Sequence, residues 1–231
     1  MTSFPLILFC LLSPLFLLAC VQQGQQQGKG RPLSSGAQTS DIQIQGSQIH
    51  FLEEGPSEAP TILLLHGARF SSKTWKKLGT LSLLSKAGYH AIAMDLPGFG
   101  SSERTELSRK DFLEAFLHAK GLSKVAIVSP SMSGSFSLPF VASHPESVWA
   151  FVPVAPASIP RYKKVLEGSR VPCLVIWGEK DGVFPVEGAK KLAQLFSDAR
   201  ILVLQGASHP CYLDQPDRFH QEMLQFFTKH R

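Results

Sequence analysis

Uninterrupted apolar runs recur through this chain, and each is followed by a stretch with helical composition. The first such run is Thr61–Leu65 and the last is Ile201–Leu204. A strand that is apolar at every position is buried on both faces, as in a parallel sheet covered by helices. Strands that alternate with helices in this way predict a doubly wound α/β fold with a mostly parallel sheet.

Two earlier strands have a different pattern. Asp41–Gln45 alternates polar and apolar side chains, which indicates a half-exposed strand. Gln48–Leu52 predicts its antiparallel partner, with the hairpin turn at Gly46-Ser47. The sheet is therefore expected to have eight strands, at residues 41–45, 48–52, 61–65, 90–94, 125–128, 149–154, 173–177 and 201–204. Helices are expected at about 73–86, 108–120, 161–166, 186–196 and 216–229, with one more ending near 142.

Residues 1–40 differ in composition from the folded domain, which we place at 41–231. Phe4–Val21 is almost wholly apolar and close to the length that spans a bilayer, so residues 1–21 are expected to be a signal or anchor segment. Residues 22–40 are rich in Gln, Gly and Ser, which is typical of a flexible linker. The expected location is a membrane or the secretory pathway, whether the segment is cleaved or kept, and the cytoplasm is the alternative.

Charge and cysteine content exclude several classes of function. The net charge of +5 comes from 23 Lys and Arg against 18 Asp and Glu, and no basic stripe is interleaved with aromatic residues. Nucleic acid is therefore not expected as a ligand. No spacing of His, Asp and Cys fits a metal site. Only Cys173 and Cys211 lie in the predicted domain, too few for a disulfide framework, and both are expected to be small buried residues.

One strand ends in an unusual group of small residues. The apolar run Val125–Val128 is followed by Ser129-Pro130-Ser131-Met132-Ser133-Gly134 and then by a potential helix. A buried strand that turns sharply into a helix, with a hydroxyl residue at the apex, describes a nucleophile elbow. Serines stand where the usual G-x-S-x-G pattern has glycines, so this motif alone is only moderately specific.

Two other strand ends carry the partners that a serine nucleophile needs. A serine hydroxyl requires a base within hydrogen-bond reach, and the base requires an orienting carboxylate. Asp181 follows the strand at 173–177, and His209 follows the last strand. The chain order Ser131, Asp181, His209 is that of an α/β-hydrolase triad, and we predict these three residues as the catalytic ones.

Two other residues are candidates for these roles. Ser133 also lies between small residues, but the strand ends too early for Ser133 to be at the apex. Asp95 follows another strand, in Asp-Leu-Pro-Gly-Phe-Gly, and its rigid turn favours a structural brace over the triad acid. For the oxyanion of an acyl-transfer intermediate, we expect backbone N–H donors from Met132 and from Ala68, which follows His66-Gly67.

At this level of detail the chain resembles a known family of α/β-hydrolases. It is similar to alpha/beta hydrolase domain-containing protein 14, forms A and B, through six segments. These are His66–Trp75, Leu78–Leu81, Ser129–Gly134, Leu138–Phe140, Phe151–Pro156 and His209–Leu213. The Ser-Pro-Ser elbow is distinctive of that group.

The resemblance implies an α/β-hydrolase fold and a serine hydrolase with the same triad. It further implies hydrolysis of short acyl, acetyl-type esters or amides through an acyl-enzyme. One form of the family is associated with deacetylation of protein lysine, with coenzyme A as the acyl acceptor. Small acyl substrates or acetylated proteins are thus the implied partners. The other form is membrane-associated, and the apolar start of this chain resembles that form in layout.

The interval from Ala155 to Pro172 bears on substrate size. Many relatives insert a lid domain here, but this interval has room for one short helix only. We therefore expect no lid domain and an open, shallow site that favours short acyl groups. The competing hypothesis is a non-catalytic α/β-hydrolase scaffold that acts as a protein-interaction module.

Overall fold

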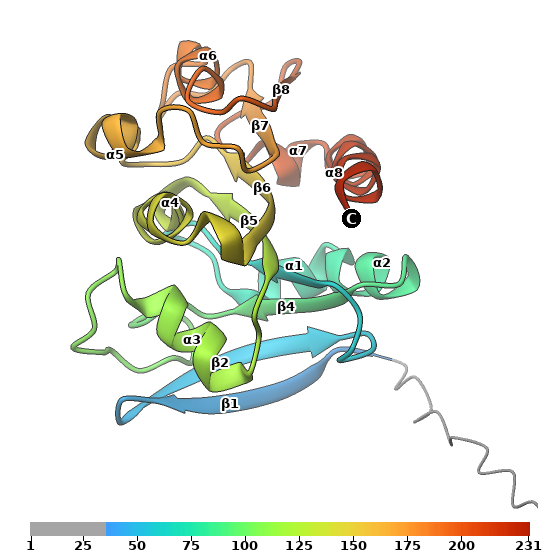
Figure 1. Cartoon of the computed structure of the whole chain (residues 1–231). Coiled ribbons are helices and arrows are strands. Elements are labelled where there is room, and N and C mark those ends of the chain that lie inside the picture. Colours follow the sequence, from blue (N-terminus) through green and yellow to red (C-terminus); the bar gives the residue numbers. More distant parts are fainter. Residues whose placement is uncertain (1–35) are drawn as a thin grey trace, which may run out of the picture. The chain divides into compact units, whose positions relative to one another are not determined.

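A mixed sheet of eight strands runs through residues 36–231, the part of the chain that the computed structural model describes (Figure 1). The strands lie in the order β1-β2-β4-β3-β5-β6-β7-β8. The pairs β1–β2 and β2–β4 are antiparallel, and all the other neighbouring pairs are parallel. This confirms the predicted eight-stranded, mostly parallel sheet with an antiparallel start.

The strands are β1 (Gln38–Ile44), β2 (Ser47–Glu54), β3 (Thr61–Leu64), β4 (His90–Met94), β5 (Val125–Pro130), β6 (Val148–Val154), β7 (Cys173–Gly178) and β8 (Ala199–Leu204). The helices are α1 (Ser72–Lys77), α2 (Thr80–Lys86), α3 (Phe112–Lys120), α4 (Gly134–Ser143), α5 (Ile159–Leu166), α6 (Glu187–Ala193), α7 (Cys211–Asp214) and α8 (Pro216–His230). Two short 3-10 turns are η1 (Ser131–Ser133) and η2 (Pro145–Ser147).

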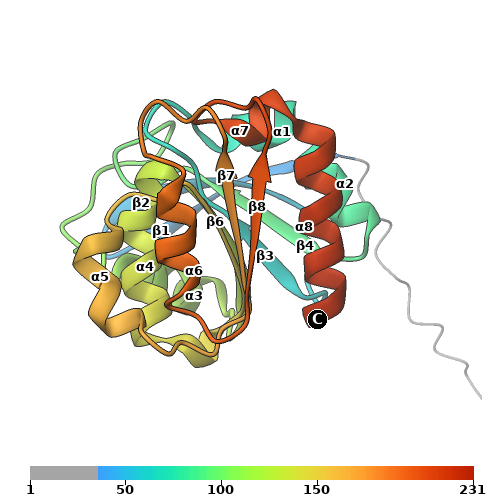
Figure 2. The ribbon, with the colours of Figure 1, turned by 90° about the horizontal axis from the view of Figure 1, so that it is seen from above.

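Helices cover both faces of the sheet, with α1, α2 and α8 on one side and α3 to α6 on the other (Figure 2). Each buried strand supplies both cores, because successive side chains point to opposite faces. In β5, Ile127 belongs to the same core as Phe112, whereas Val128 belongs to the core that contains Trp75. This arrangement explains why the central strands are apolar at every position.

The folded part begins earlier than predicted. The linker was expected over 22–40, but β1 starts at Gln38, which pairs with Glu53 of β2. Ser40 also donates a hydrogen bond to the Glu53 carboxylate at 3.4 Å. Strand pairing thus stabilises a polar edge that composition alone assigns to a linker. Residues 22–35 of the expected linker and the segment at 1–21 lie outside the described residues.

No helix within residues 36–231 combines the length and apolar character needed to cross a membrane. The apolar run at 4–21, on which the predicted membrane attachment depends, lies outside that range. The expectation of a signal or anchor segment therefore stays a prediction.

Two local predictions were wrong at turns. The β1–β2 turn consists of Gln45 and Gly46, not Gly46-Ser47, and both turn residues have positive φ, 47° and 84°. A type I′ hairpin turn requires this backbone at both central positions. The helix expected over 73–86 is split into α1 and α2 at Gly79, where φ is 76°. A left-handed residue cannot continue a helix, so the chain changes direction there.

A single helix, α5, lies between β6 and β7, and no lid domain is inserted there. The carboxyl ends of β3, β5, β7 and β8 are followed by His66, Ser131, Asp181 and His209. Neighbouring parallel strands bring their carboxyl ends to one edge of the sheet, where sites in such folds form. The topology therefore gathers the predicted site residues at that edge.

Candidate active site

Ser131 lies at a sharp turn between β5 and α4. Its φ is 51°, a left-handed conformation that is uncommon for a residue with a side chain. The Ala157 N–H donates to the Ser131 carbonyl at 2.8 Å, which fixes the strained backbone from the loop after β6. Such strain persists where the surroundings impose it, and it is concentrated at functional sites. The predicted apex residue is thus the one with the elbow conformation.

The small residues around the elbow have separate structural reasons. A Cβ added to Gly134 would lie 2.5 Å from the Ala157 carbonyl oxygen, so no larger residue fits without movement. Ser133 is fully buried, and its hydroxyl donates to the Pro130 carbonyl at 2.8 Å. It also contacts the Ser129 hydroxyl at 3.0 Å. These contacts make Ser133 part of the turn and support its rejection as the nucleophile.

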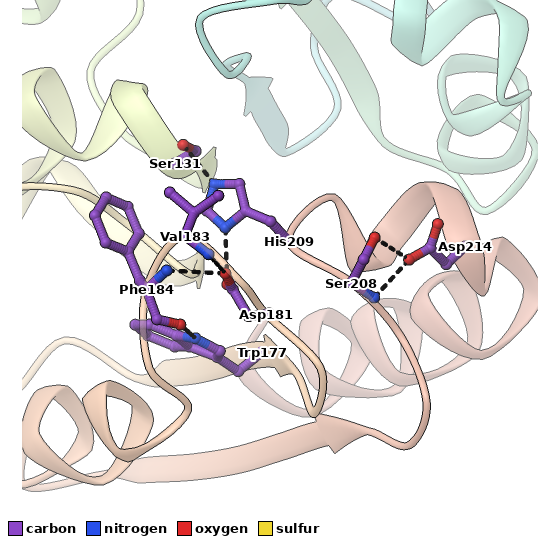
Figure 3. A network of polar contacts seen from close by, with 8 residues as sticks. All are labelled: Ser131, Trp177, Asp181, Val183, Phe184, Ser208, His209 and Asp214. Carbon is purple, nitrogen blue, oxygen red and sulfur yellow. Dashed lines mark hydrogen bonds and ion pairs between the residues drawn. The ribbon is translucent and has the colours of Figure 1, made fainter.

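The three predicted catalytic side chains form one continuous hydrogen-bonded chain (Figure 3). His209 Nε2 lies 2.8 Å from Ser131 Oγ, and His209 Nδ1 lies 2.7 Å from Asp181 Oδ2. Because a carboxylate only accepts, the Nδ1 atom carries the proton and Nε2 is left to accept from the serine hydroxyl. The geometry is therefore that of a nucleophile, its base and an orienting acid.

The Asp181 side chain is fully buried and held from a second direction. Its Oδ1 atom accepts the N–H groups of Val183 and Phe184 at 2.8 and 2.9 Å (Figure 3). The turn that begins at Asp181-Gly182 thus serves to orient the carboxylate. This arrangement leaves Oδ2 free to face the imidazole of His209.

Three contacts around the triad were not found by sequence reasoning. Asp214, in α7, accepts the N–H and the hydroxyl of Ser208, both at 2.6 Å, and so braces the loop that carries His209 (Figure 3). The Phe184 ring meets the His209 ring edge-on, with centroids 5.4 Å apart. The Trp177 indole N–H donates to the Phe184 carbonyl at 3.0 Å. In the sequence, Asp214 is recognisable only as an acid five residues after His209. Its helix, α7, has four residues and is too short to show periodicity.

The expected oxyanion loop lies against the nucleophile. A Cβ added to Gly67 would lie 3.5 Å from the Ser131 Cβ, so this loop passes directly beside the elbow. His66 holds the loop, because its Nδ1–H donates to the Gly67 carbonyl at 2.9 Å while Nε2 accepts the Leu96 N–H at 2.9 Å. Burial lowers the pKa of His66, which favours the neutral ring that both bonds require. Ala68 follows on the exposed side.

Asp95 is placed as a brace, as predicted. It is fully buried, and its two oxygens accept the N–H groups of Ser72 at 2.6 Å and Ser101 at 2.8 Å. The turn closes tightly, because a Cβ on Gly100 would collide with this carboxylate. With both oxygens engaged in this way, Asp95 orients the loop that leads into α1 and lies outside the hydrogen-bonded chain from Ser131 to Asp181.

Both cysteines of the domain are free and buried, as expected. Cys211 lies two residues after His209, and burial raises the pKa of its thiol to about 12. A thiol in that state is a poor nucleophile at neutral pH. Within residues 36–231, no group of three His, Cys, Asp or Glu side chains is arranged to hold a metal ion.

Comparison with known proteins places this geometry in context. A family model described as "alpha/beta hydrolase fold" matches residues 60–166, and one described as "TAP-like protein" matches residues 141–231. A human protein named "Putative protein-lysine deacylase ABHD14B" is 40% identical over 198 residues, covering 80% of this chain and 92% of its own length. Zebrafish (Danio rerio) "Protein ABHD14A" is 41% identical over 178 residues, covering 73% of this chain and 64% of its own.

A solved structure agrees in fold. A "predicted CIB-like hydrolase" from Thermoplasma acidophilum superimposes with a TM-score of 0.80 at 28% identity. The match covers 83% of this chain and 98% of that one.

Proposed function

This chain belongs to the ABHD14 family of alpha/beta hydrolases, and on that premise we propose that it is a serine hydrolase that cleaves short acyl esters or amides through an acyl-enzyme. The observation that carries the proposal is the relay from Ser131 through His209 to Asp181, with both hydrogen bonds shorter than 3 Å. Its residues come from three strand ends that lie far apart in the sequence.

The first half of the reaction forms the acyl-enzyme. The Ser131 Oγ attacks the acyl carbon while His209 Nε2 takes the hydroxyl proton, and Asp181 stabilises the resulting imidazolium. The oxyanion is stabilised by the backbone N–H groups of Met132 and Ala68. When the bond to the leaving group breaks, His209 returns the proton to that group, and the acyl group stays on Ser131.

The second half transfers the acyl group to an acceptor. Water or a thiol gives its proton to His209 and attacks the acyl carbon, and Ser131 then leaves and recovers the proton. Acetylated lysine of a protein is the amide substrate that the human relative's name suggests. The open carboxyl edge of the sheet, without a lid, supports a substrate presented on a large surface.

We extend the proposal to coenzyme A as an acyl acceptor. A cavity of about 470 Å³ adjoins Ala68 and is lined by Arg69, Lys73 and Lys77, with no acidic residue in its wall. Within the described part of the chain, these three cations make no ion pair or side-chain hydrogen bond. Unpaired cations beside the oxyanion loop support an acceptor that carries phosphate.

A substrate panel tests this function. Purified protein is assayed against p-nitrophenyl acetate, butyrate and octanoate and against an acetyl-lysine peptide, each with and without coenzyme A. We expect turnover of the short esters that is lost in Ser131→Ala, and acetyl-coenzyme A as a product from the peptide. A folded protein without Ser131-dependent turnover of any substrate would favour the non-catalytic scaffold. A preference for octanoate over acetate would contradict the open, shallow site.

Attachment to a membrane through residues 4–21 is a separate proposal. It is supported by the apolar composition of Phe4–Val21 in the sequence. Carbonate extraction of membranes from cells that express the full chain tests it. Integral association of the full chain, lost when Leu11 and Leu12 are both replaced by Arg, is the expected result, and release of the full chain into the supernatant would contradict it.

A further inference from the structure

A small apolar cavity lies beside the triad and has no role in the mechanism above. Its volume is about 240 Å³, and its walls are the loop Pro156–Pro160, the buried Trp177, and Phe184 with the first turn of α6 at Gly188. Drug-sized ligands occupy pockets of about 300–1,000 Å³, so this cavity suits a smaller group. Its lining segments follow the carboxyl ends of β6 and β7, and Ser131 likewise follows the carboxyl end of β5.

Two walls of the cavity contact the proposed catalytic residues. The Ala157 N–H donates to the Ser131 carbonyl at 2.8 Å, so the Pro156–Pro160 loop begins at the elbow itself. On the other side, the Phe184 ring lies edge-on against the His209 ring, 5.4 Å between centroids (Figure 3). Both walls are therefore next to residues of the proposed relay.

The walls of the cavity are mostly apolar, and Ser158 and Lys191 are the polar side chains among them. The indole N–H of Trp177 is already used by the Phe184 carbonyl, so the indole offers no free donor to the cavity. No Asp or Glu lines the cavity, and its one charged residue, Lys191, is exposed to solvent. This contrasts with the cavity beside Ala68, whose walls carry three cations. The two sides of the nucleophile thus differ in polarity.

The size of the cavity depends on a glycine. A Cβ at Gly188 would lie 2.8 Å from the Trp177 ring carbon Cη2, so a side chain there would displace the indole that forms one wall of the cavity. Ile159, the first residue of α5, also lines the cavity and is half-buried. Position 159 is therefore the place where a larger or smaller side chain changes the cavity without touching the triad.

We propose that this cavity binds the hydrocarbon part of the acyl group on Ser131 and limits its length to a few carbons, with Ile159 as a specificity-determining residue. The inference rests on the proposed serine hydrolase function. It assigns the acyl group to the Trp177 side of the nucleophile and leaves the Ala68 side for the leaving group and the acceptor.

The test is a chain-length series on three variants. Ile159→Trp fills the cavity, Ile159→Ala enlarges it, and Val165→Trp is the control. Val165 lies on the same helix but is 62% exposed and lines a different cavity, at the amino ends of the strands. The kcat/KM for p-nitrophenyl acetate, butyrate and hexanoate is measured for each.

We expect Ile159→Trp to lower the butyrate-to-acetate ratio of kcat/KM by about tenfold or more, because each methylene in an apolar pocket is worth about tenfold or more. Ile159→Ala should raise the hexanoate-to-acetate ratio, and Val165→Trp should leave both ratios unchanged. Ser131-dependent turnover with unchanged ratios in both Ile159 variants would overturn the acyl cavity alone. Absence of Ser131-dependent turnover in the unmodified protein would overturn the proposed function and the cavity with it.

Discussion

At the scale of single residues, the proposed mechanism depends on how the His209 ring is held. Asp181 fixes which ring nitrogen carries the proton, because its carboxylate can only accept from Nδ1. Asp214 acts one step further away, through the Ser208 hydroxyl and N–H. The two acids therefore have different roles, and removing their charges should have different consequences.

Replacement of Asp181 by Asn should lower kcat for p-nitrophenyl acetate by about 10³–10⁴-fold, with a small change in KM. The amide can donate to Nδ1, which moves the imidazole proton to Nε2 and removes the acceptor for the serine hydroxyl. Asp214→Asn, the matched control, keeps the tautomer and should cost about tenfold or less by loosening the loop. Equal losses in the two variants would contradict the separation of roles.

At this scale the sequence was sufficient to predict which three side chains meet. Ser131, Asp181 and His209 each follow a recognisable apolar strand, so chain order and topology together bring them to one edge of the sheet. The contacts of Asp214 and Phe184 were not predictable in this way. They depend on where a four-residue helix and a ring lie in three dimensions, and neither leaves a periodic pattern.

At the scale of secondary-structure elements, the elbow depends on how closely α4 approaches the loop after β6. Gly134 begins α4, and the carbonyl of Ala157 lies where its Cβ would be. The same loop donates the hydrogen bond that fixes Ser131. Enlarging residue 134 should therefore disturb both stability and the nucleophile.

We expect Gly134→Ala to lower the free energy of unfolding by about 1–3 kcal/mol, because the added methyl forces a backbone shift in a packed interface. Gly182→Ala is the control, since nothing lies within 4 Å of a Cβ there and its φ is not in the left-handed region. Urea unfolding followed by circular dichroism gives both values. If Gly134→Ala were as stable as Gly182→Ala, the start of α4 would have room for a methyl group beside the Ala157 carbonyl, which would contradict the close contact.

Element boundaries were the least predictable feature of the fold. The break at Gly79 divides a stretch whose composition is helical throughout. Strand β1 includes polar residues whose composition is that of a linker. The helix break is caused by one left-handed residue, and the start of β1 is determined by its pairing with β2. Local composition predicts neither boundary. The order of the eight strands along the chain, which depends on long apolar runs, was predicted correctly, whereas the split of 73–86 into α1 and α2 and the short helix α7 were not.

At the scale of the whole molecule, Glu53 connects the antiparallel and parallel parts of the sheet to a covering helix. Its carboxylate in β2 meets His90 of β4 at 3.0 Å and Lys120 of α3 at 2.9 Å. The hydrogen bond from His90 and the pairing with Lys120 lower the pKa of Glu53 to about 2, despite an opposing effect of burial. This group should therefore link folding to pH.

The sign of the linkage follows from the pKa. A carboxylate whose folded pKa is below its unfolded value adds stability at higher pH and loses it as the pH falls from about 4.5 towards 2. We expect Glu53→Gln to reduce the free energy of unfolding at pH 6 by on the order of 1–2 kcal/mol, because solvent screens part of this partly exposed ion pair, and to flatten its decline below pH 4.5. Glu54→Gln, at the neighbouring position of β2, should leave that decline intact. An unchanged pH profile in Glu53→Gln would contradict the linkage.

The central claim for the molecule as a whole is that its nucleophile is the hydroxyl of Ser131, and covalent labelling tests it most directly. The full chain is treated with a fluorophosphonate, and the modified residue is located by peptide mass spectrometry in the unmodified protein, Ser131→Ala and Ser133→Ala. We expect one label on Ser131, no label in Ser131→Ala, and unchanged labelling in Ser133→Ala. Labelling that survives in Ser131→Ala but is lost in Ser133→Ala, or no labelling of the folded protein, would contradict it.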